Sequence, residues 1–302
     1  MEAARGFGKI LFLVESGGPG GAERVVLSLA KSYQQSGVSV AVLTFRSGWF
    51  TEQLDKENIP RHHIVSHFPF DVTLPFRIAR LIRQENIQVL HSHLLDSNFY
   101  GGLAARIAGV RHLATEHGDV HHPQSTKMMG FKLRILRALG TKFTAVSRYT
   151  AKALASFGVE SSAISVVGNP IPTHAASSDG SSRALIRGEL GIDESCWVWI
   201  HVANLRPVKD QRTLLEGFKL SCALDPKQHL LIVGDGPERA ALEAQADSDS
   251  RISFLGHRDD VPSLLTASDG FILSSRSEAL PMALLGLLIF TFSVLNFRKR
   301  VQ

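Results

Sequence analysis

Residues 9–24 read K-I-L-F-L-V-E-S-G-G-P-G-G-A-E-R, an apolar run followed by a glycine-rich turn and the start of a helical pattern. A short apolar run of this kind is typical of a strand that is buried on both faces. Glycines let the backbone approach a ligand closely, and a helix that starts there offers free N–H groups to an anion. The stretch predicts one strand–turn–helix unit of a parallel sheet. A plain connection between strand and helix is the alternative.

The same alternation continues as far as residue 170, which favours a parallel sheet with helices on both faces. The expected strands are Lys9–Val14, Val38–Phe45, Gln88–His91, Arg111–Thr115, Lys142–Val146 and Ser165–Val167, and the expected helices are Gly21–Gln35, Pro75–Glu85, Ser97–Ala108, Lys127–Leu139 and Arg148–Phe157.

A segment rich in Pro, Ser and Gly at 169–180 interrupts the alternation and is typical of a linker between domains. Beyond it the alternation restarts. The expected strands there are Trp197–Val202, His229–Val233, Arg251–Leu255 and Gly270–Leu273, and the expected helices are Gln211–Leu224, Glu238–Asp247 and Val261–Ala267. A chain of 302 residues is long enough for two domains. We expect two Rossmann-like, doubly wound α/β domains facing across a cleft, because such sheets bind ligands at the carboxyl ends of their strands.

Composition narrows the class of protein. The chain is 44% hydrophobic and 20% charged, as folded globular proteins are, and its net charge is +5. This basic excess suits an anionic substrate or an anionic membrane surface, and no run of lysines interleaved with aromatics indicates nucleic-acid binding. The two cysteines, Cys196 and Cys222, form no CxxC pair, and residues 1–8 contain no signal-peptide core. We therefore expect a cytoplasmic protein.

Two cations follow the first strand of the second half, in N-L-R-P-V-K-D at 204–210. Arg206 can bind phosphate oxygens in a fork, and Lys209 adds a mobile point charge. Together they could stabilise the negative charge that develops on a departing diphosphate. The alternative is that both are ordinary solvated surface charges.

Two more loops accompany this pair: G-D-G-P-E at 234–238 and S-S-R-S-E-A-L-P at 274–281. Each follows an expected strand, and Pro281 suits the first turn of a helix. Plain strand-to-helix turns are the alternative for each. Their joint spacing within one α/β domain favours a phosphate-binding edge.

A dinucleotide-dependent oxidoreductase is the alternative from another class. Its glycine fingerprint fails, since the sixth position counted from Gly18 is Glu23 and not a glycine. The expected second strand ends in T-F-R at 44–46, without the acid that would bind a ribose.

Eight short motifs follow one another along residues 9–285: G-G-A-E-R at 20–24, H-S-H at 91–93, T-E-H-G at 115–118, A-V-S-R-Y-T at 145–150, N-L-R-P-V-K-D at 204–210, V-G-D-G-P-E-R at 233–239, F-L-G-H at 254–257 and S-E-A-L-P-M-A-L-L at 277–285. In this order the motifs resemble glycosyltransferase family 4, a group of retaining enzymes with the GT-B fold.

The resemblance implies a nucleotide-sugar donor, a glycan or lipid-linked acceptor, and a role in polysaccharide biosynthesis. It implies donor binding by Gly20, Gly21, Asn204, Arg206, Lys209, Gly234, Gly236, Gly256, His257, Glu278, Ala279, Leu280 and Pro281, acceptor-side positions at Gly20, His93 and His117, and catalytic roles for His117, Arg206, Lys209 and Glu278. Without the resemblance, a core or surface histidine is the simpler interpretation of His117. Peripheral association with the inner face of a membrane is left open.

No cofactor and no metal is implied for the chemistry. The one D-x-D spacing, at 247–249, lies at an expected helix end and is better interpreted as solvated. The reaction implied is front-face substitution, in which positioning and charge stabilisation replace a protein nucleophile.

The resemblance breaks after Leu285. The family places a second Glu eight residues after the first, and here that position is Gly286, which has no side chain to bind a ribose. The expected organisation is an acceptor-side domain at 1–172, a linker at 173–190, an incomplete donor domain at 191–285 and a hydrophobic and basic tail at 286–302. A non-catalytic nucleotide-sugar or glycan-binding remnant is therefore the alternative function.

The tail has two interpretations. Residues 279–297 carry no charge and are of borderline length for a bilayer span, and R-K-R follows at 298–300. A truncated or altered coding sequence is favoured over a membrane anchor, because half of the apolar run continues the family pattern and contains Pro281.

Overall fold

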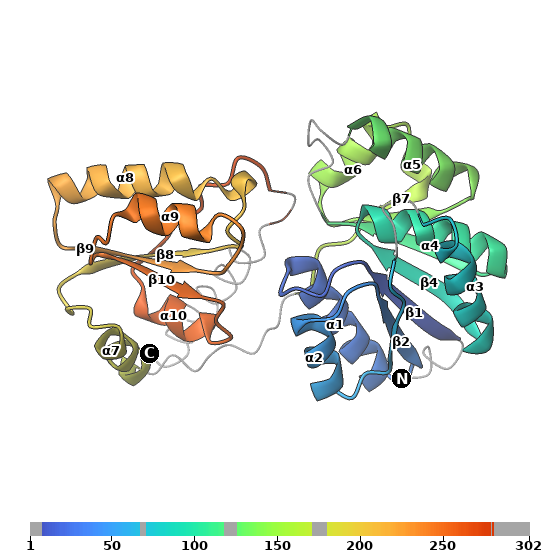
Figure 1. Cartoon of the computed structure of the whole chain (residues 1–302), viewed down its shortest axis with the longest axis horizontal. Coiled ribbons are helices and arrows are strands. Elements are labelled where there is room, and N and C mark those ends of the chain that lie inside the picture. The colour runs from blue at the N-terminus through green and yellow to red at the C-terminus, as the bar shows by residue number, and fades with distance from the viewer. Residues whose placement is uncertain (1–7, 67–70, 118–125, 171–179, 279, 281–302) are drawn as a thin grey trace, which may run out of the picture. The chain divides into compact units, whose positions relative to one another are not determined.

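The computed structural model describes residues 8–66, 71–117, 126–170, 180–278 and 280 of the chain (Figure 1). The chain divides into two compact units, Met1–Pro170 and Ile171–Gln302. Each unit consists of a parallel β-sheet with helices packed on both faces.

The first unit has a seven-stranded sheet in the order β3-β2-β1-β4-β5-β6-β7. Its strands are β1 (Lys9–Val14), β2 (Val40–Thr44), β3 (Arg61–His63), β4 (Ile87–His93), β5 (Arg111–Glu116), β6 (Lys142–Ala145) and β7 (Ile164–Val166). Its α-helices are α1 (Gly21–Gln35), α2 (Trp49–Lys56), α3 (Leu74–Gln84), α4 (Leu95–Ala108), α5 (Thr126–Ala138) and α6 (Arg148–Ser156), and Ser161–Ala163 form a short 3₁₀ turn.

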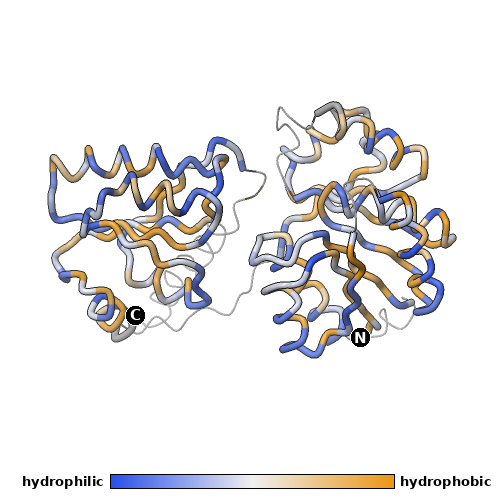
Figure 2. The backbone as a smooth tube through the Cα atoms, in the orientation of Figure 1, coloured by the Kyte–Doolittle hydropathy of each residue, from blue (hydrophilic) through white to orange (hydrophobic). Residues whose placement is uncertain are grey.

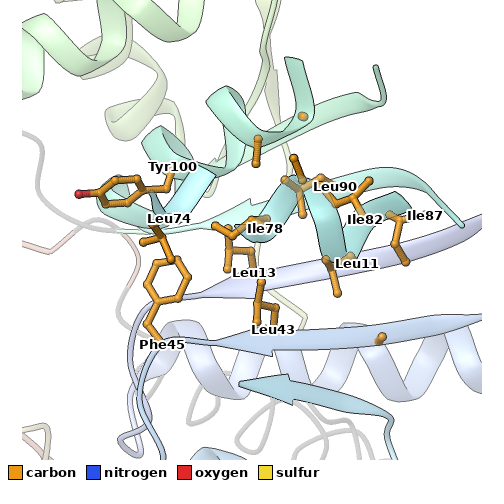
Figure 3. Close-up of a cluster of buried hydrophobic side chains, with 14 residues drawn as sticks. Leu11, Leu13, Leu43, Phe45, Leu74, Ile78, Ile82, Ile87, Leu90 and Tyr100 are labelled. Atoms are coloured by element: carbon orange, nitrogen blue, oxygen red, sulfur yellow. The ribbon is translucent and has the colours of Figure 1, made fainter. Parts of the chain in front are cut away.

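Strand β1 is apolar throughout because both of its faces are covered. Ile10, Phe12 and Val14 pack with residues of α1 and α2. Leu11 and Leu13 point to the other face, where they pack with α3 and α4 (Figure 3). Alternate side chains of a strand point to opposite faces, so one continuous apolar run supplies two cores. Figure 2 shows the result, with hydrophobic strands inside and hydrophilic colour along the outer helices and loops.

The second unit has a four-stranded sheet in the order β10-β9-β8-β11 among the residues described. Its strands are β8 (Trp197–Val202), β9 (Gln228–Val233), β10 (Ile252–Gly256) and β11 (Gly270–Phe271), and its helices are α7 (Gly180–Glu189), η3 (Pro207–Lys209), α8 (Gln211–Leu224), α9 (Arg239–Ala246) and α10 (Val261–Ala267). Helices α7 and α10 cover one face, and α8 and α9 cover the other.

Both sheets contain a point where the strand order reverses. In the first unit the chain runs outward from β1 through β2 to β3 and then returns to β4 on the other side of β1. In the second it runs from β8 to β10 and returns to β11 beside β8. Open α/β sheets bind ligands at the carboxyl ends of the strands that flank such a reversal.

The expected fold class is confirmed, since both sheets are parallel and doubly wound. The predicted bounds of β1, α1, β8, α8 and α10 match the structure residue for residue. Helix α2 and strand β3 were not predicted. Strand β3 has only three polar residues, R-H-H, at the edge of the sheet and therefore carries no apolar signal.

Helix α7 also differs from the prediction, because it lies within the expected linker 173–190. Its buried Ile186 belongs to the core of the second unit. Among the described helices, none combines the length and the apolar character that a bilayer crossing requires. The expectations for residues 286–302 lie outside the described residues.

Arg187 connects α7 to the sheet and is only 2% exposed. Its Nε donates to the carbonyl of Ala267 and one Nη donates to that of Cys196, both at 2.9 Å. The other Nη donates to Asp269 Oδ2 at 2.6 Å. The buried guanidinium is satisfied by these partners, whereas its removal leaves the two carbonyls and the carboxylate without their donor.

Arg187→Ala should therefore destabilise the second unit by about 3 kcal/mol, which is typical of a broken buried ion pair. The control is Arg183→Ala, because Arg183 pairs with the same aspartate at 2.5 Å but has a side chain that is 37% exposed. Its loss should change stability by less than about 1 kcal/mol. Hydrogen exchange should show lost protection in β8 and β9 for the first variant only, and equal losses in the two variants would contradict this account.

Candidate functional site

The loop after β8 is held by the loop after β9. Leu205 N donates to Asp235 O at 2.9 Å, and Glu238 N donates to Leu205 O at 3.2 Å. A Cβ on Gly234 would lie 2.0 Å from the Ala203 carbonyl oxygen, and a Cβ on Gly236 would lie 2.4 Å from that of Leu205. These two glycines are thus required because the loops touch backbone to backbone.

Lys209 and Glu278 meet at the carboxyl edge of this sheet, although they are far apart in sequence. Lys209 Nζ lies 2.5 Å from Glu278 Oε1, and Ser275 Oγ donates to the same oxygen at 2.6 Å. The two charged side chains are 19% and 20% exposed. Lys209 has three N–H donors, so pairing with Glu278 leaves it able to bind an anion as well.

Backbone contacts fix this arrangement. Arg276 N donates to Val208 O at 2.9 Å, and Ser274 Oγ donates to Lys209 O at 2.8 Å. The loop after β11 is therefore bound along η3, which carries Lys209. Beyond η3, Asp210 has a φ of 49° and accepts a hydrogen bond from Arg276 Nε at 2.8 Å.

His201 lies beneath the loop after β8 and is fully buried. Its Nδ1 lies 3.0 Å from Ile272 O, and its Nε2 lies 3.3 Å from Gln211 Nε2. The carbonyl oxygen can only accept a hydrogen bond and the amide nitrogen can only donate one, so His201 carries its proton on Nδ1. Burial lowers its pKa, which keeps the ring neutral. Gln211 Nε2 also donates to Asn204 O at 3.0 Å. His201 and Gln211 together thus link Ile272, the residue after β11, to the loop that carries Arg206.

Several other predicted donor-binding residues follow strands of the second unit, whereas Gly20 and Gly21 belong to the first unit. Arg206 and Asn204 are exposed. Gly256, with a φ of 65°, accepts from Gly234 N at 2.7 Å, and exposed His257 follows it. Leu280 is half-buried. Ala279 and Pro281 lie outside the described residues.

In the first unit, the glycine turn after β1 is open at one position. A Cβ on Gly18 would meet nothing within 4 Å, whereas one on Gly17 would lie 2.6 Å from Ser47 O. Gly20 is the N-cap of α1, and exposed Gly21 is the first residue of that helix.

His93 and His117 lie at the carboxyl ends of neighbouring strands. His93 Nδ1 is 2.7 Å from His117 Nε2, and their rings stack with centroids 5.1 Å apart. Strand β4 runs two residues further than predicted, to His93, whose side chain is fully buried. His117 follows β5 and is half-buried. Burial lowers the pKa of His117 to about 4, so it is neutral near pH 7.

Two carboxyl groups at the carboxyl ends of β1 and β5 were not predicted as site residues. Glu15 Oε2 accepts from Ser97 N at 2.9 Å in the first turn of α4, where a negative charge is favoured. Glu116 is buried, and its Oε1 accepts from Asn98 Nδ2 at 2.7 Å. Burial raises the pKa of both carboxyl groups to about 7. Their position in the sequence could have identified them, since Glu15 directly follows β1 and Glu116 ends β5.

Within the part of the chain that the structure describes, no group of three or more His, Cys, Asp or Glu side chains is arranged to hold a metal ion.

Two Rossmann-like units, the second with a cation and glycine turns at its carboxyl edge, define the GT-B class of fold. Residues 19–175 match Glycosyltransferase Family 4, and residues 182–289 match Glycosyl transferases group 1. The chain belongs to glycosyltransferase family 4, as the motifs of its sequence predicted.

Individual relatives agree with this assignment. The chain is 28% identical over 235 residues to N-acetyl-alpha-D-glucosaminyl L-malate synthase of Bacillus anthracis, a match that covers 75% of this chain and 61% of that protein. It is 27% identical over 220 residues to UDP-Gal:alpha-D-GlcNAc-diphosphoundecaprenol alpha-1,3-galactosyltransferase of Escherichia coli, covering 69% and 57%. The matches therefore span less than two thirds of either relative.

The fold agrees with solved structures. Anabaena Alr3699/HepE in complex with UDP and glucose superimposes with a TM-score of 0.80 at 23% identity, over 93% of this chain and 78% of that one. This likeness supports the GT-B architecture.

Glu116 gives a pH-dependent prediction. Its carboxyl group ionises near 4.5 in the unfolded chain and near 7 in the folded one. Between these values the unfolded state releases a proton that the folded state keeps, so stability falls as the pH rises. Relative to Glu116→Gln, the unmodified chain should lose on the order of 3 kcal/mol between about pH 4.5 and pH 7.5. Urea unfolding of both proteins at each pH measures the difference, in which the effects of the buried histidines cancel. A pH-independent difference would contradict the raised pKa.

Proposed function

We propose that this chain is the nucleotide-sugar-binding and transferring part of a retaining glycosyltransferase. The cluster of Lys209, Glu278 and Ser275 at the strand-order reversal of the second unit carries the proposal. In it, Lys209 and Arg206 bind the donor diphosphate, and the carboxylate of Glu278 accepts hydrogen bonds from the hydroxyls of the donor sugar. One cluster thus binds both the sugar and the diphosphate, the two groups joined by the bond that breaks.

The chemistry follows from this placement. The bond between the anomeric carbon and the diphosphate oxygen breaks, and the electron pair goes to the diphosphate. The acceptor hydroxyl oxygen bonds to the same carbon from the face that the diphosphate leaves, and its proton passes to a diphosphate oxygen. Negative charge grows on the leaving group, so fixed cations stabilise the transition state more than the ground state.

The first unit supplies the acceptor side in this proposal. The open glycine turn ending at Gly20 and the half-buried ring of His117 lie at the carboxyl edge of its sheet. Both positions suit contacts with hydroxyl groups, since backbone N–H groups and an imidazole can each hydrogen-bond an oxygen.

We further propose that the acceptor is lipid-linked and that the first unit docks on an anionic membrane. The E. coli relative is named for a diphosphoundecaprenol acceptor. Residues 120–159 contain no acidic residue, and apolar and basic side chains are exposed together there on α5 and α6. The exposed residues of this α5–α6 surface are Met128, Phe131, Arg134, Arg137, Arg148, Tyr149 and Lys152. Such a mixture fits the interface of an anionic bilayer.

The diphosphate assignment is tested by binding UDP and GDP to the purified chain in a calorimeter. Lys209→Ala should weaken binding about tenfold or more, because a charge-assisted hydrogen bond contributes about 2 kcal/mol. The control is Lys227→Ala, since Lys227 precedes β9 at the opposite end of the strands. The Lys227→Ala variant should bind the nucleotides with unchanged affinity. Equal affinities for Lys209→Ala and the unmodified chain would contradict the assignment of Lys209 to the diphosphate.

Turnover distinguishes transfer from binding alone. In a chain that transfers sugar, Lys209→Ala should abolish transfer while the fold is kept. Nucleotide binding without transfer to any acceptor, and without donor hydrolysis, would favour the alternative of a non-catalytic binding protein, to which the glycine at position 286 also points.

The membrane proposal is tested by sedimentation with vesicles of phosphatidylglycerol and of phosphatidylcholine. The chain should bind the anionic vesicles only, and Phe131→Ser should lower the affinity about thirtyfold, since burying a Phe side chain contributes about 2 kcal/mol. Leu224→Ser is the control, because Leu224 is 90% exposed on α8 of the other unit. Equal binding of the Phe131 and Leu224 variants, or equal binding to the two kinds of vesicle, would contradict this surface assignment.

A further inference from the structure

The hydrogen bond between His93 and His117 restricts which ring nitrogens of the two histidines can carry a proton. It joins Nδ1 of His93 to Nε2 of His117 at 2.7 Å. The remaining ring nitrogen of His93, Nε2, is buried and has no hydrogen-bond partner. Its neighbour His91 is already engaged, because its own Nε2 lies 2.7 Å from Thr115 Oγ1.

Only one arrangement of protons avoids a buried, unpaired N–H. A bond between two neutral imidazole nitrogens needs one N–H and one bare nitrogen. Were the proton on His117 Nε2, His93 would carry its own proton on Nε2, where no acceptor exists. With the proton on His93 Nδ1, the unpaired nitrogen is a bare acceptor. Orphaned buried N–H groups are rarer in proteins than unpaired acceptors, which favours the second arrangement.

Both rings are neutral near pH 7. Burial lowers the pKa of His93 well below its usual value and that of His117 to about 4. Burial also lowers the pKa of the neighbouring His91 to about 3, so that ring is neutral as well.

We infer that His93 donates its Nδ1 proton to Nε2 of His117 and so fixes His117 in the tautomer that carries its proton on Nδ1. No residue in the described ranges hydrogen-bonds to His117 Nδ1, so this N–H is the group that the ring can offer to a ligand.

This inference rests on the proposed function and specifies the role of His117 in it. His117 would donate a hydrogen bond to a substrate oxygen, a sugar or acceptor hydroxyl, and would not take up its proton. That agrees with a reaction in which the acceptor proton passes to the leaving diphosphate. His93, which is fully buried, would be a positioning residue and not a contact of the acceptor.

The tautomer can be read directly by NMR. Two-bond ¹H–¹⁵N correlations of the ¹⁵N-histidine-labelled chain distinguish a protonated Nδ1 from a protonated Nε2, and single His→Asn variants assign the signals. We expect His117 to be protonated on Nδ1 in the unmodified chain and on Nε2 in His93→Phe. His93→Asn, which keeps an N–H donor near the place of Nδ1, should retain the Nδ1 form. His112→Asn is the control, because His112 is buried in the same sheet but bonds Ser92 and Thr141.

A proton on Nε2 of His117 in the unmodified chain would overturn the inference, as would a tautomer that is unchanged in His93→Phe. In a transfer assay, His93→Phe should lower kcat about tenfold or more with both KM values nearly unchanged, and His93→Asn should restore most of kcat. The predicted tautomer in a chain without any turnover would contradict the proposed function and leave the inference standing.

Discussion

The salt bridge between Lys209 and Glu278 is the contact on which the second unit's site depends. It joins the loops that follow β8 and β11, the two strands at which the order of the sheet reverses. Ser275 donates to the same carboxylate oxygen, and the backbone of Arg276 is bound to that of Val208. A cation held in this way is arranged before a ligand arrives, so little reorganisation is needed when charge develops on a leaving group. Because both side chains are about one-fifth exposed, water screens their charges only in part.

The carboxyl edge of the first unit differs from that of the second, because burial and not pairing with an opposite charge dominates the pKa values of the histidines and of Glu15 and Glu116 there. Its ionisable groups are held neutral or close to neutrality by burial, the histidines with lowered pKa values and Glu15 and Glu116 with pKa values near 7. Burying such groups opposes folding, and clusters with strongly shifted pKa values are typical of functional sites. The hydrogen bonds from Ser97 and Asn98 to the two carboxyl groups offset part of this penalty.

Much of this architecture could be predicted from the sequence, because it depends on local patterns. The apolar runs of β1, β8 and β9, with the glycine turns after β1 and β9, indicated the fold class and the sheet edge where Arg206 and Lys209 lie. The short polar strand β3 escaped prediction, since an edge strand needs no apolar face. Contacts between residues far apart in the sequence, such as the salt bridge between Lys209 and Glu278, could not be predicted from local patterns. The burial of His93 was missed because it depends on a strand extending two residues beyond its apolar part.

The most direct test of the central claim is a crystal structure of the chain with UDP, or with whichever nucleoside diphosphate binds. Diphosphate oxygens should lie within hydrogen-bond distance of Lys209 Nζ and of the guanidinium of Arg206, with the salt bridge to Glu278 retained or exchanged for the phosphate. A diphosphate bound at the glycine turn of the first unit, with Lys209 and Arg206 not touching it, would contradict this claim.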